Sequence, residues 1–250
     1  MVKVSRQGAI MKRSIIILLL LFFISTLFSI QNWDKLKLKG KVKQFEEINF
    51  NNDKMISKKI YNFNKIGFLI KVEYYSDDSL FLSTVYKYDD KNINTGYIDY
   101  DEEGKILRTH LCEYKNDRLI QIKILDSNEQ LNYTGKYEYD IKGNLVRMEE
   151  WNKNNEIETY HLSKYDEKNN LIELSHHFPA GRSQKFQYFY NDKNELIKEE
   201  TFYNDIKEFV TLFSYEYNET GNIIKTKKIN IKDGAEIGKE EVLYKYFYYN

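Results

Sequence analysis

The 250-residue chain has one cysteine, one proline and no net charge. A single cysteine excludes an internal disulfide, so packing and hydrogen bonding must hold the fold. The 38 basic residues balance 38 acidic ones, which gives no support for nucleic acid as a partner, because phosphate binding needs a clear basic excess. With one proline against 22 tyrosines and 15 phenylalanines, little interrupts the β-strands that aromatic residues favour.

The longest apolar run is short and lies near the N-terminus. A basic pair at 12–13 precedes the run over 15–24, and the small residue Ser29 follows. This order is typical of a secretory signal, and the run is shorter than the ~20 residues of a comfortable membrane span. We predict a signal peptide over residues 1–29, with Met11 as the start and an uncleaved anchor as the alternative. The protein is then exported, to the periplasm, the cell surface or the medium, and contacts the membrane through this segment alone if it stays uncleaved.

Aromatic residues recur along the chain at a nearly constant spacing. The second aromatic of an aromatic-x-aromatic element, here called the anchor, falls at Phe63, Tyr88, Tyr114, Tyr139, Tyr165, Tyr190 and Tyr217. In the elements that end at Tyr114 and Tyr165, Cys112 and Ser163 take the place of the first aromatic residue. Successive anchors are 25 to 27 residues apart. A period of this length is typical of repeat proteins, whose units bury their apolar faces against their neighbours.

Each anchor is followed by residues that specify a turn. The next residue is mostly Asp or Asn, whose side chain bonds the backbone two residues on. Four residues after the anchor, six repeats have Gly or Asn, which readily accept a left-handed backbone. The chain then becomes apolar again, at Leu69, Leu145, Leu171, Leu196 and Ile223. The pattern predicts two strands and two tight turns per repeat, an antiparallel meander.

One segment carries the pattern most completely: Tyr137-Glu138-Tyr139-Asp140-Ile141-Lys142-Gly143-Asn144-Leu145. It resembles the RHS/YD-repeat family, whose units read roughly Tyr-x-Tyr-Asp-x-x-Gly-Asn-Leu. The degenerate form extends from Tyr61 to beyond Tyr217. Related variants resemble small secreted bacterial repeat proteins that open with a Leu-Lys-Gly-Lys-Val-Lys segment, matched here by residues 38–43. Large family members carry a cleavage motif and a toxin after their repeats, and neither feature transfers to this chain.

We predict an all-β fold: an antiparallel meander of about seven two-strand repeats, with a period of about 25–26 residues, that forms one long twisted or curled sheet. The repeat domain is placed at residues 61–250, and N-terminal capping strands at 30–60. Over residues 35–43 five lysines alternate with smaller or apolar residues. This predicts an edge strand whose charges prevent aggregation, with contact to an anionic envelope polymer as the alternative.

The residues with chemical potential are dispersed. His110 and Cys112 lie two apart on one strand face, a spacing that a metal can use, but Cys112 occupies a tyrosine column and is expected to be a packed thiol. His161 is equivalent to His110 but about 19 Å away, at ~4.8 Å per strand. His176 and His177 are adjacent, so in a strand they point to opposite faces. We therefore expect no metal site.

The aspartates after the anchors also point to structure and not to catalysis. Asp89, Asp140 and Asp166 form a ladder with about one carboxylate per turn, whereas calcium needs six to eight converging oxygens. Turn capping is the better interpretation. No nucleophile elbow, phosphate loop, zinc motif or dinucleotide motif is present. We expect neither an enzyme nor a cofactor.

Three functions remain open. The first is an exported, non-enzymatic repeat module that binds or scaffolds at the cell surface or in the periplasm. The second is an outer-membrane β-barrel, which a meander with many aromatics also fits. It is disfavoured because consecutive residues such as Lys198, Glu199 and Glu200 put charge on both strand faces, which a lipid-facing band does not allow. The third is an enzyme with an unrecognised site.

One aromatic column offers a candidate binding surface: Tyr75, Tyr100, Trp151 and Phe202. If this face is open, it is a row of flat platforms for an extended polymer, either an envelope polysaccharide or a protein segment. The alternative is that the column is the inner, packed face of the curled sheet. The partner itself is not identified by the sequence.

Overall fold

A computed structural model describes residues 36–51 and 53–249 of the chain. The predicted signal peptide at 1–29 lies outside the described residues. The described part consists of antiparallel strands and one short 3-10 turn, η1 (Pro179–Gly181). Within it, no helix is long and apolar enough to cross a membrane.

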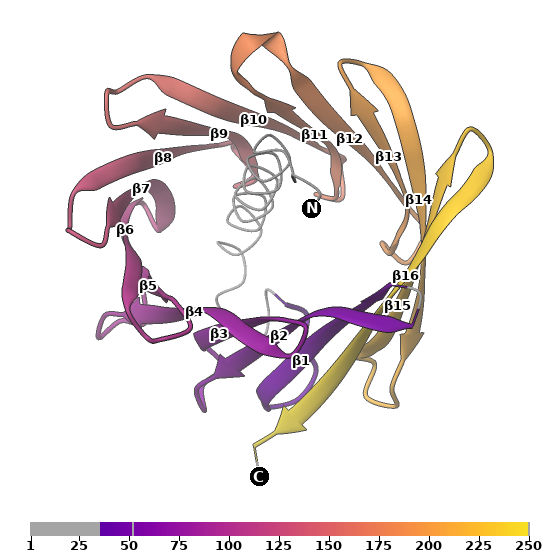
Figure 1. Ribbon diagram of the computed structural model, residues 1–250, viewed down its shortest axis with the longest axis horizontal. Coiled ribbons are helices and arrows are strands. Elements are labelled where there is room, and N and C mark those ends of the chain that lie inside the picture. The colour runs from indigo at the N-terminus through magenta and orange to yellow at the C-terminus, as the bar shows by residue number, and fades with distance from the viewer. Residues whose placement is uncertain (1–35, 52, 250) are drawn as a thin grey trace, which may run out of the picture.

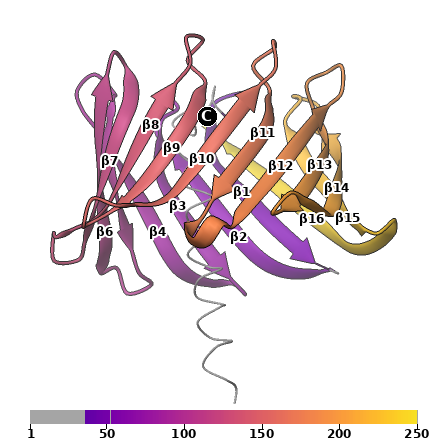
Figure 2. The same cartoon turned by 90° about the horizontal axis from the view of Figure 1, so that it is seen from above.

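The strands are short, regular and joined by tight turns at both ends of the molecule (Figure 2). In chain order they are β1 (Val42–Asn51), β2 (Lys54–Phe63), β3 (Leu69–Ser76), β4 (Ser79–Tyr88), β5 (Asn94–Tyr100), β6 (Ile106–Lys115), β7 (Arg118–Asp126), β8 (Leu131–Tyr139), β9 (Leu145–Asn152), β10 (Ile157–Tyr165), β11 (Leu171–His177), β12 (Ser183–Tyr190), β13 (Leu196–Tyr203), β14 (Ile206–Tyr217), β15 (Ile223–Lys232) and β16 (Ala235–Tyr248).

The sheet closes into a barrel (Figure 1). Each strand pairs with its neighbours in the chain, and β1 pairs antiparallel with β16 to complete a ring of 16 strands. The predicted antiparallel meander is confirmed, but the predicted long twisted or curled sheet is wrong, because the sheet closes on itself. Closure joins the two edge strands, so their N–H and C=O groups find partners that an open sheet would leave to solvent.

The N-terminal part of the barrel differs from the prediction in the same way. The lysine-rich residues 36–41 precede β1, which begins at Val42 and has a partner on each side. There is therefore no lysine edge strand in this part of the described chain. The division between capping strands at 30–60 and a repeat domain from residue 61 remains a prediction.

The turns after the anchors are those that the sequence predicts. Asp166 is representative: its Oδ1 accepts hydrogen bonds from the backbone N of Lys168 at 2.9 Å and of Asn170 at 2.8 Å. Asn169, four residues after the anchor Tyr165, has a positive φ of 64°. The same bonds recur at Asn64, Asp89 and Asn191. The side chain thus satisfies backbone donors that the tight turn leaves without a strand partner.

At five places a tyrosine hydroxyl joins one repeat to the repeat before it. Tyr190, for example, donates a hydrogen bond to the backbone oxygen of Leu171, the first residue of β11. Five such bonds have lengths of 2.6 to 3.0 Å, and their donors are Tyr88, Tyr165, Tyr190, Tyr215 and Tyr246. In the seventh repeat Tyr215 donates the bond, and not the anchor Tyr217. The recurring tyrosine therefore holds adjacent hairpins in register.

Candidate binding sites on the inner wall

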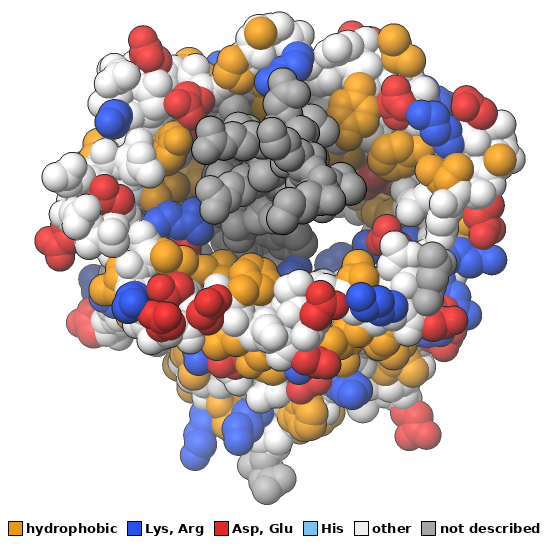
Figure 3. All heavy atoms as spheres, in the orientation of Figure 1, with side chains coloured by type: hydrophobic (Ala, Val, Ile, Leu, Met, Phe, Trp, Pro, Cys, Tyr) orange, Lys and Arg blue, Asp and Glu red, His pale blue; other side chains and the backbone are white. Residues whose placement is uncertain are grey.

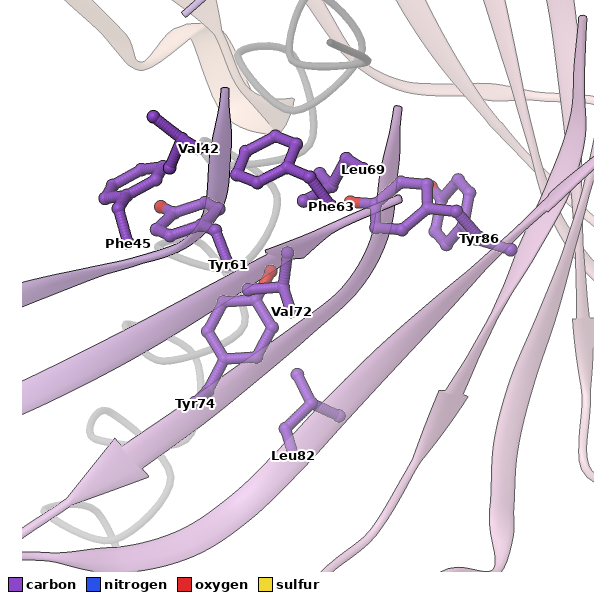
Figure 4. Close-up of a cluster of buried hydrophobic side chains, with 10 residues drawn as sticks. Val42, Phe45, Tyr61, Phe63, Leu69, Val72, Tyr74, Leu82 and Tyr86 are labelled. Atoms are coloured by element: carbon purple, nitrogen blue, oxygen red, sulfur yellow. The ribbon is translucent and has the colours of Figure 1, made fainter. Parts of the chain in front are cut away.

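Side chains alternate between the inner and the outer surface of the barrel along every strand, as in other barrels. Tyr61, Val72, Thr84 and Asp99 are cross-strand partners in one row, and all four are buried. Their sequence neighbours on the opposite face are more exposed or carry charge. Figure 4 shows the buried set on the side of β1 to β4 that faces the interior. The row therefore belongs to the inner wall.

The first region of this wall is apolar. Its buried cluster, here called the aromatic wall, consists of Val42, Phe45, Tyr61, Phe63, Leu69, Val72, Tyr74, Leu82, Tyr86 and Tyr97 (Figure 4). Phe45 stacks on Tyr61 with ring centroids 4.2 Å apart, and Tyr86 lies 5.6 Å from Tyr97. Rings packed in this way stabilise the barrel across five neighbouring strands. Desolvation raises the pKa of the buried tyrosines, so they stay neutral.

Next to the aromatic wall lies a buried ionic network around Asp99 on β5. Its carboxylate accepts a hydrogen bond from Thr84 Oγ1 at 2.7 Å, lies 3.1 Å from His110 Nε2 and pairs with Arg108 at 2.9 Å. Burial opposes the charge, but the bonds to His110, Arg108 and Thr84 lower the pKa of Asp99. Burial also lowers the pKa of His110, which stacks on Tyr97 at 3.9 Å. The network compensates one buried carboxylate and is a structural element of the wall.

Cys112 lies two residues beyond His110 on the same face. Its Sγ donates to Asn94 Oδ1 at 3.4 Å, and burial raises the pKa of the thiol to about 12. A thiol that stays protonated is a poor nucleophile and ligand, as expected for a packed cysteine. Across residues 36–51 and 53–249, no three His, Cys, Asp or Glu side chains converge in a way that could hold a metal ion.

The structure brings together two histidines that the sequence interpretation kept apart. His161 on β10 and His176 on β11 are direct cross-strand partners on the inner wall, with ring centroids 4.3 Å apart. His177 points to the outer face, where it stacks on Tyr160 at 4.4 Å. Burial lowers the pKa of His161 to about 4, and that of His176 to about 3. Both inner imidazoles are therefore neutral at physiological pH.

A pocket of about 660 Å³ opens in the wall formed by β13 to β16 and the end of β1. We call it the luminal pocket. Its lining combines charged groups, amides and rings: Asn51, Leu196, Glu199, Phe209, Thr211, Phe213, Lys228, Asn230, Ile237, Gly238, Lys239 and Glu240. This size lies within the range of about 300–1,000 Å³ that suits small-molecule sites.

Polar side chains in the luminal pocket orient one another. Thr211 Oγ1 donates to Asn230 Oδ1 at 2.8 Å, and Asn230 Nδ2 donates to Glu240 Oε1 at 3.4 Å. Lys228 Nζ lies 3.9 Å from Glu240. Desolvation raises the pKa of Glu199, and the positive charge of Lys228 partly offsets this rise. The pocket therefore presents fixed donors and acceptors next to two phenylalanine rings.

The candidate aromatic column lies on the other side of the sheet. Tyr75, Tyr100, Trp151 and Phe202 are half-buried on the outer face of β3, β5, β9 and β13. Lysine ammonium groups lie over three of the rings, at 4.6 Å for Tyr75, 3.7 Å for Trp151 and 4.9 Å for Phe202. The column is thus neither the packed inner wall nor a row of bare platforms. Polymer binding by these residues remains a prediction.

Ion pairs cover the outer face between these aromatic residues. Lys71 pairs with Glu73 at 2.8 Å, and Arg147 pairs with Glu149 at 2.7 Å. Further outward pairs join Lys164 to Glu173, Lys198 and Lys207 to Glu200, Lys225 to Glu241 and Lys227 to Glu216. Figure 3, a view onto one end of the ring, shows acidic and basic side chains around its rim. The outer face therefore carries ion pairs on several strands, and exposed apolar side chains such as Leu111, Leu162 and Leu212 lie on it as well.

Comparison with known proteins places the fold among barrels. Neither a protein-family model nor a curated protein sequence matches this chain. Its structure is similar to that of a porin-like protein from Bacteroides uniformis, with a TM-score of 0.62 and 13% identity over 84% of this chain and 99% of that one. At this identity the likeness shows the fold alone.

Two weaker likenesses carry no argument about this chain. A porin-like protein from Bacteroides vulgatus has a TM-score of 0.29 and 10% identity, over 82% of this chain and 98% of that one. A TcdB2-TccC3 structure has a TM-score of 0.35 and 14% identity, over 75% of this chain and 13% of that one. The predicted membership of the RHS/YD-repeat family therefore remains a prediction.

Proposed function

We propose that the chain is a porin-like barrel of the bacterial cell envelope whose working surface is its inner wall, where the luminal pocket binds a small saccharide. The closed ring and the porin-like fold support a barrel over an open scaffold. A ring of 16 strands is wide enough for an aqueous lumen, so a small solute reaches the inner wall. Export and a non-enzymatic role are parts of the same proposal.

The observation that carries the proposal is the chemistry of the luminal pocket. Sugars present hydroxyl groups at their edges and C–H groups on their ring faces. Glu199, Lys228 and Asn230 offer acceptors and donors for the former, and Phe209 and Phe213 offer aromatic faces for the latter. A mixed lining fits a polar ligand better than an apolar one.

The charged residues on the outer face favour a barrel that is surrounded by water over one that is embedded in a lipid bilayer. A lipid-facing Lys or Arg near the bilayer midplane costs about 2–4 kcal/mol. Lys71, Arg147, Lys198 and Lys225 all point outward from within strands and pair there with carboxylates. Such residues on β3, β9, β13 and β15 make insertion unfavourable. We therefore expect the protein to purify without detergent.

Binding is tested with the full chain by titration calorimetry against glucose, galactose, maltose and glucuronate. We expect at least one sugar to bind, and Glu199→Gln and Phe213→Ala to weaken it by about tenfold, which is ~1.4 kcal/mol. Glu200→Gln and Leu212→Ala are matched controls, because these neighbours point outward. Equal binding by control and pocket variants, or binding of no sugar, would contradict the proposal.

The second candidate is an outer-membrane pore, which the porin-like fold and the strand number favour. It requires the outward ion pairs to tolerate a lipid environment. Fractionation of the producing cell, followed by carbonate extraction of membranes, separates the two settings. Recovery in the extracted outer membrane, together with conductance in a planar bilayer, would favour the pore. Recovery in the soluble envelope fraction would favour the barrel in water.

A further inference from the structure

A row of side chains that differs from the luminal pocket crosses the opposite part of the inner wall. Tyr137 on β8, Met148 on β9, His161 on β10 and His176 on β11 are successive cross-strand partners. Partners opposite each other have Cβ atoms about 4.5–5.5 Å apart. Met148 and His161 are therefore direct neighbours on the inner wall, and the ring of His161 in turn lies next to that of His176.

We propose that Met148, His161 and His176 form a binding site for a monovalent copper ion on the inner wall of the barrel. No part of the saccharide proposal is needed for this site, because it uses other strands and other residues. Methionine sulfur and imidazole nitrogen are ligands that Cu(I) prefers, and methionine in particular selects a soft ion. A carboxylate, which would favour harder divalent ions, is not part of the row.

The spacing of the two rings fits a shared ion. Imidazole nitrogens bind such metals at about 2.0–2.1 Å, which places the centroids of two rings on one ion roughly 5–5.5 Å apart at tetrahedral or trigonal angles. The observed separation of 4.3 Å, with an interplanar angle of 76°, needs an opening of about 1 Å. Changes of this size lie within the range of side-chain rotation without any shift of the strands.

The residues around the two histidines are apolar, which favours a monovalent ion over a divalent one. Phe186 lies 5.5 Å from the ring of His176, and Phe178 lies 6.3 Å from it. Met148 is also buried, within a cluster that includes Ile122 and Tyr137. An apolar environment penalises a divalent ion more than a monovalent one, because the cost of desolvation rises with charge.

The test uses the purified full chain under reducing conditions, with Cu(I) supplied by a chromophoric chelator that reports free and bound copper by absorbance. We expect one ion per chain. Each of His161→Gln and His176→Gln should weaken Cu(I) binding by more than the ~10–100-fold that loss of a supporting residue costs. Met148→Leu should weaken Cu(I) binding while leaving binding of Zn(II) unchanged, because zinc does not need the thioether.

Two controls distinguish the site from general imidazole binding. His177→Gln removes the histidine next to His176, but its ring lies outside the barrel on Tyr160. His110→Gln removes the other inner-wall histidine, which Asp99 holds. Both variants should bind Cu(I) as the parent protein does. Circular dichroism of every variant verifies the β-fold, and loss of binding in a folded His177→Gln chain, or retention in folded His161→Gln, would overturn the proposal.

Discussion

Asn222 and Lys39 are joined by two hydrogen bonds, although 183 positions separate them in the chain. The backbone N of Lys39 donates to Asn222 Oδ1 at 2.6 Å, and Asn222 Nδ2 donates to the backbone O of Lys39 at 3.0 Å. The same amide lies 3.0 Å from the hydroxyl of Tyr248 at the end of β16. One buried side chain therefore ties both ends of the described chain to the turn before β15.

Replacement of Asn222 by Ala should destabilise the closed barrel by about 1–3 kcal/mol, because buried backbone and hydroxyl groups lose their partners. Asn170 is a matched control: it occupies the same place in its repeat, but its amide bonds Asp166 and Asn194 within neighbouring turns. Urea unfolding of both Ala variants gives the comparison. A larger loss for Asn170→Ala would show that Asn222 has no special role in closure.

Removal of one tyrosine hydroxyl should weaken the contact between adjacent repeats. Tyr190→Phe deletes the 2.9 Å bond to Leu171 O and keeps the ring, so we expect a loss of about 0.5–1.5 kcal/mol. Tyr139 stands at the same place in its repeat, and no hydroxyl bond is found for it within the described chain, so Tyr139→Phe is the control. Thermal unfolding of both variants tests the difference, and equal melting temperatures would contradict the assigned role.

Stability should fall with pH below about 6.5, through the two inner-wall histidines. Their folded pKa values, about 4 and about 3, lie below the ordinary value of 6.5, so the unfolded chain binds more protons across this window. The contribution is fully present above pH 6.5 and is lost as the pH drops toward 3. It is on the order of a few kcal/mol for each histidine.

Other buried groups act in the same pH range or below it. Burial raises the pKa of Glu150 and Glu199, so the stability that they contribute is lost as the pH rises. The pKa of Asp99 is lowered, so the stability that it contributes is lost only as the pH falls below its ordinary value of 3.8. The measurement therefore compares the pH dependence of stability in histidine variants with that in the parent protein. Urea midpoints from pH 7.5 to 4.5 should depend less on pH in the His161→Gln/His176→Gln variant than in the parent or in His177→Gln. Parallel curves for all three would exclude the histidine pair as the cause.

Fluorescence of Trp151 tests the placement of the aromatic column on the outer face. The chain has two tryptophans, so the experiment uses a Trp33→Phe background. Acrylamide should quench Trp151, and iodide should quench it more strongly than in a Lys136→Met variant, because the Lys136 ammonium lies 3.7 Å from the ring centroid and attracts the anion. Blue-shifted emission without acrylamide quenching would place the ring in a packed interior instead.

Local features were readable from the sequence because local chemistry determines them. The Asp or Asn after each anchor caps its turn, and a left-handed residue follows, as at Asp166 and Asn169. The turn then fixes the pairing of anchor with apolar column, as in Tyr165 with Leu171. Closure was not readable, since it depends on β1 meeting β16, and no pattern within a repeat relates strands so far apart.

The histidine pair was within reach of the sequence only with the exact register of the two strands. Counting back from Tyr165 and Leu171 places His161 opposite Ser175, and the register shift between Lys164 and Tyr165 moves it opposite His176. The sequence interpretation instead compared His161 with its equivalent His110, four strands away, and His176 with its neighbour His177. The luminal pocket had no such signal, because its lining comes from four neighbouring strands and the end of β1 and depends on closure. The sequence also carried no signal for whether the aromatic column faces the inside or the outside of the barrel.

Because the first strand pairs with the last, the number of repeats that the gene encodes sets the diameter of the barrel. Each internal hairpin hydrogen-bonds to its neighbours in the same way, so a duplicated unit of about 25 residues inserts two strands and leaves the closing pair of β1 and β16 unchanged. A deleted unit removes two. Unequal recombination among tandem copies thus changes the diameter in fixed increments without requiring a new closing contact, and bore size can evolve separately from the chemistry of the wall.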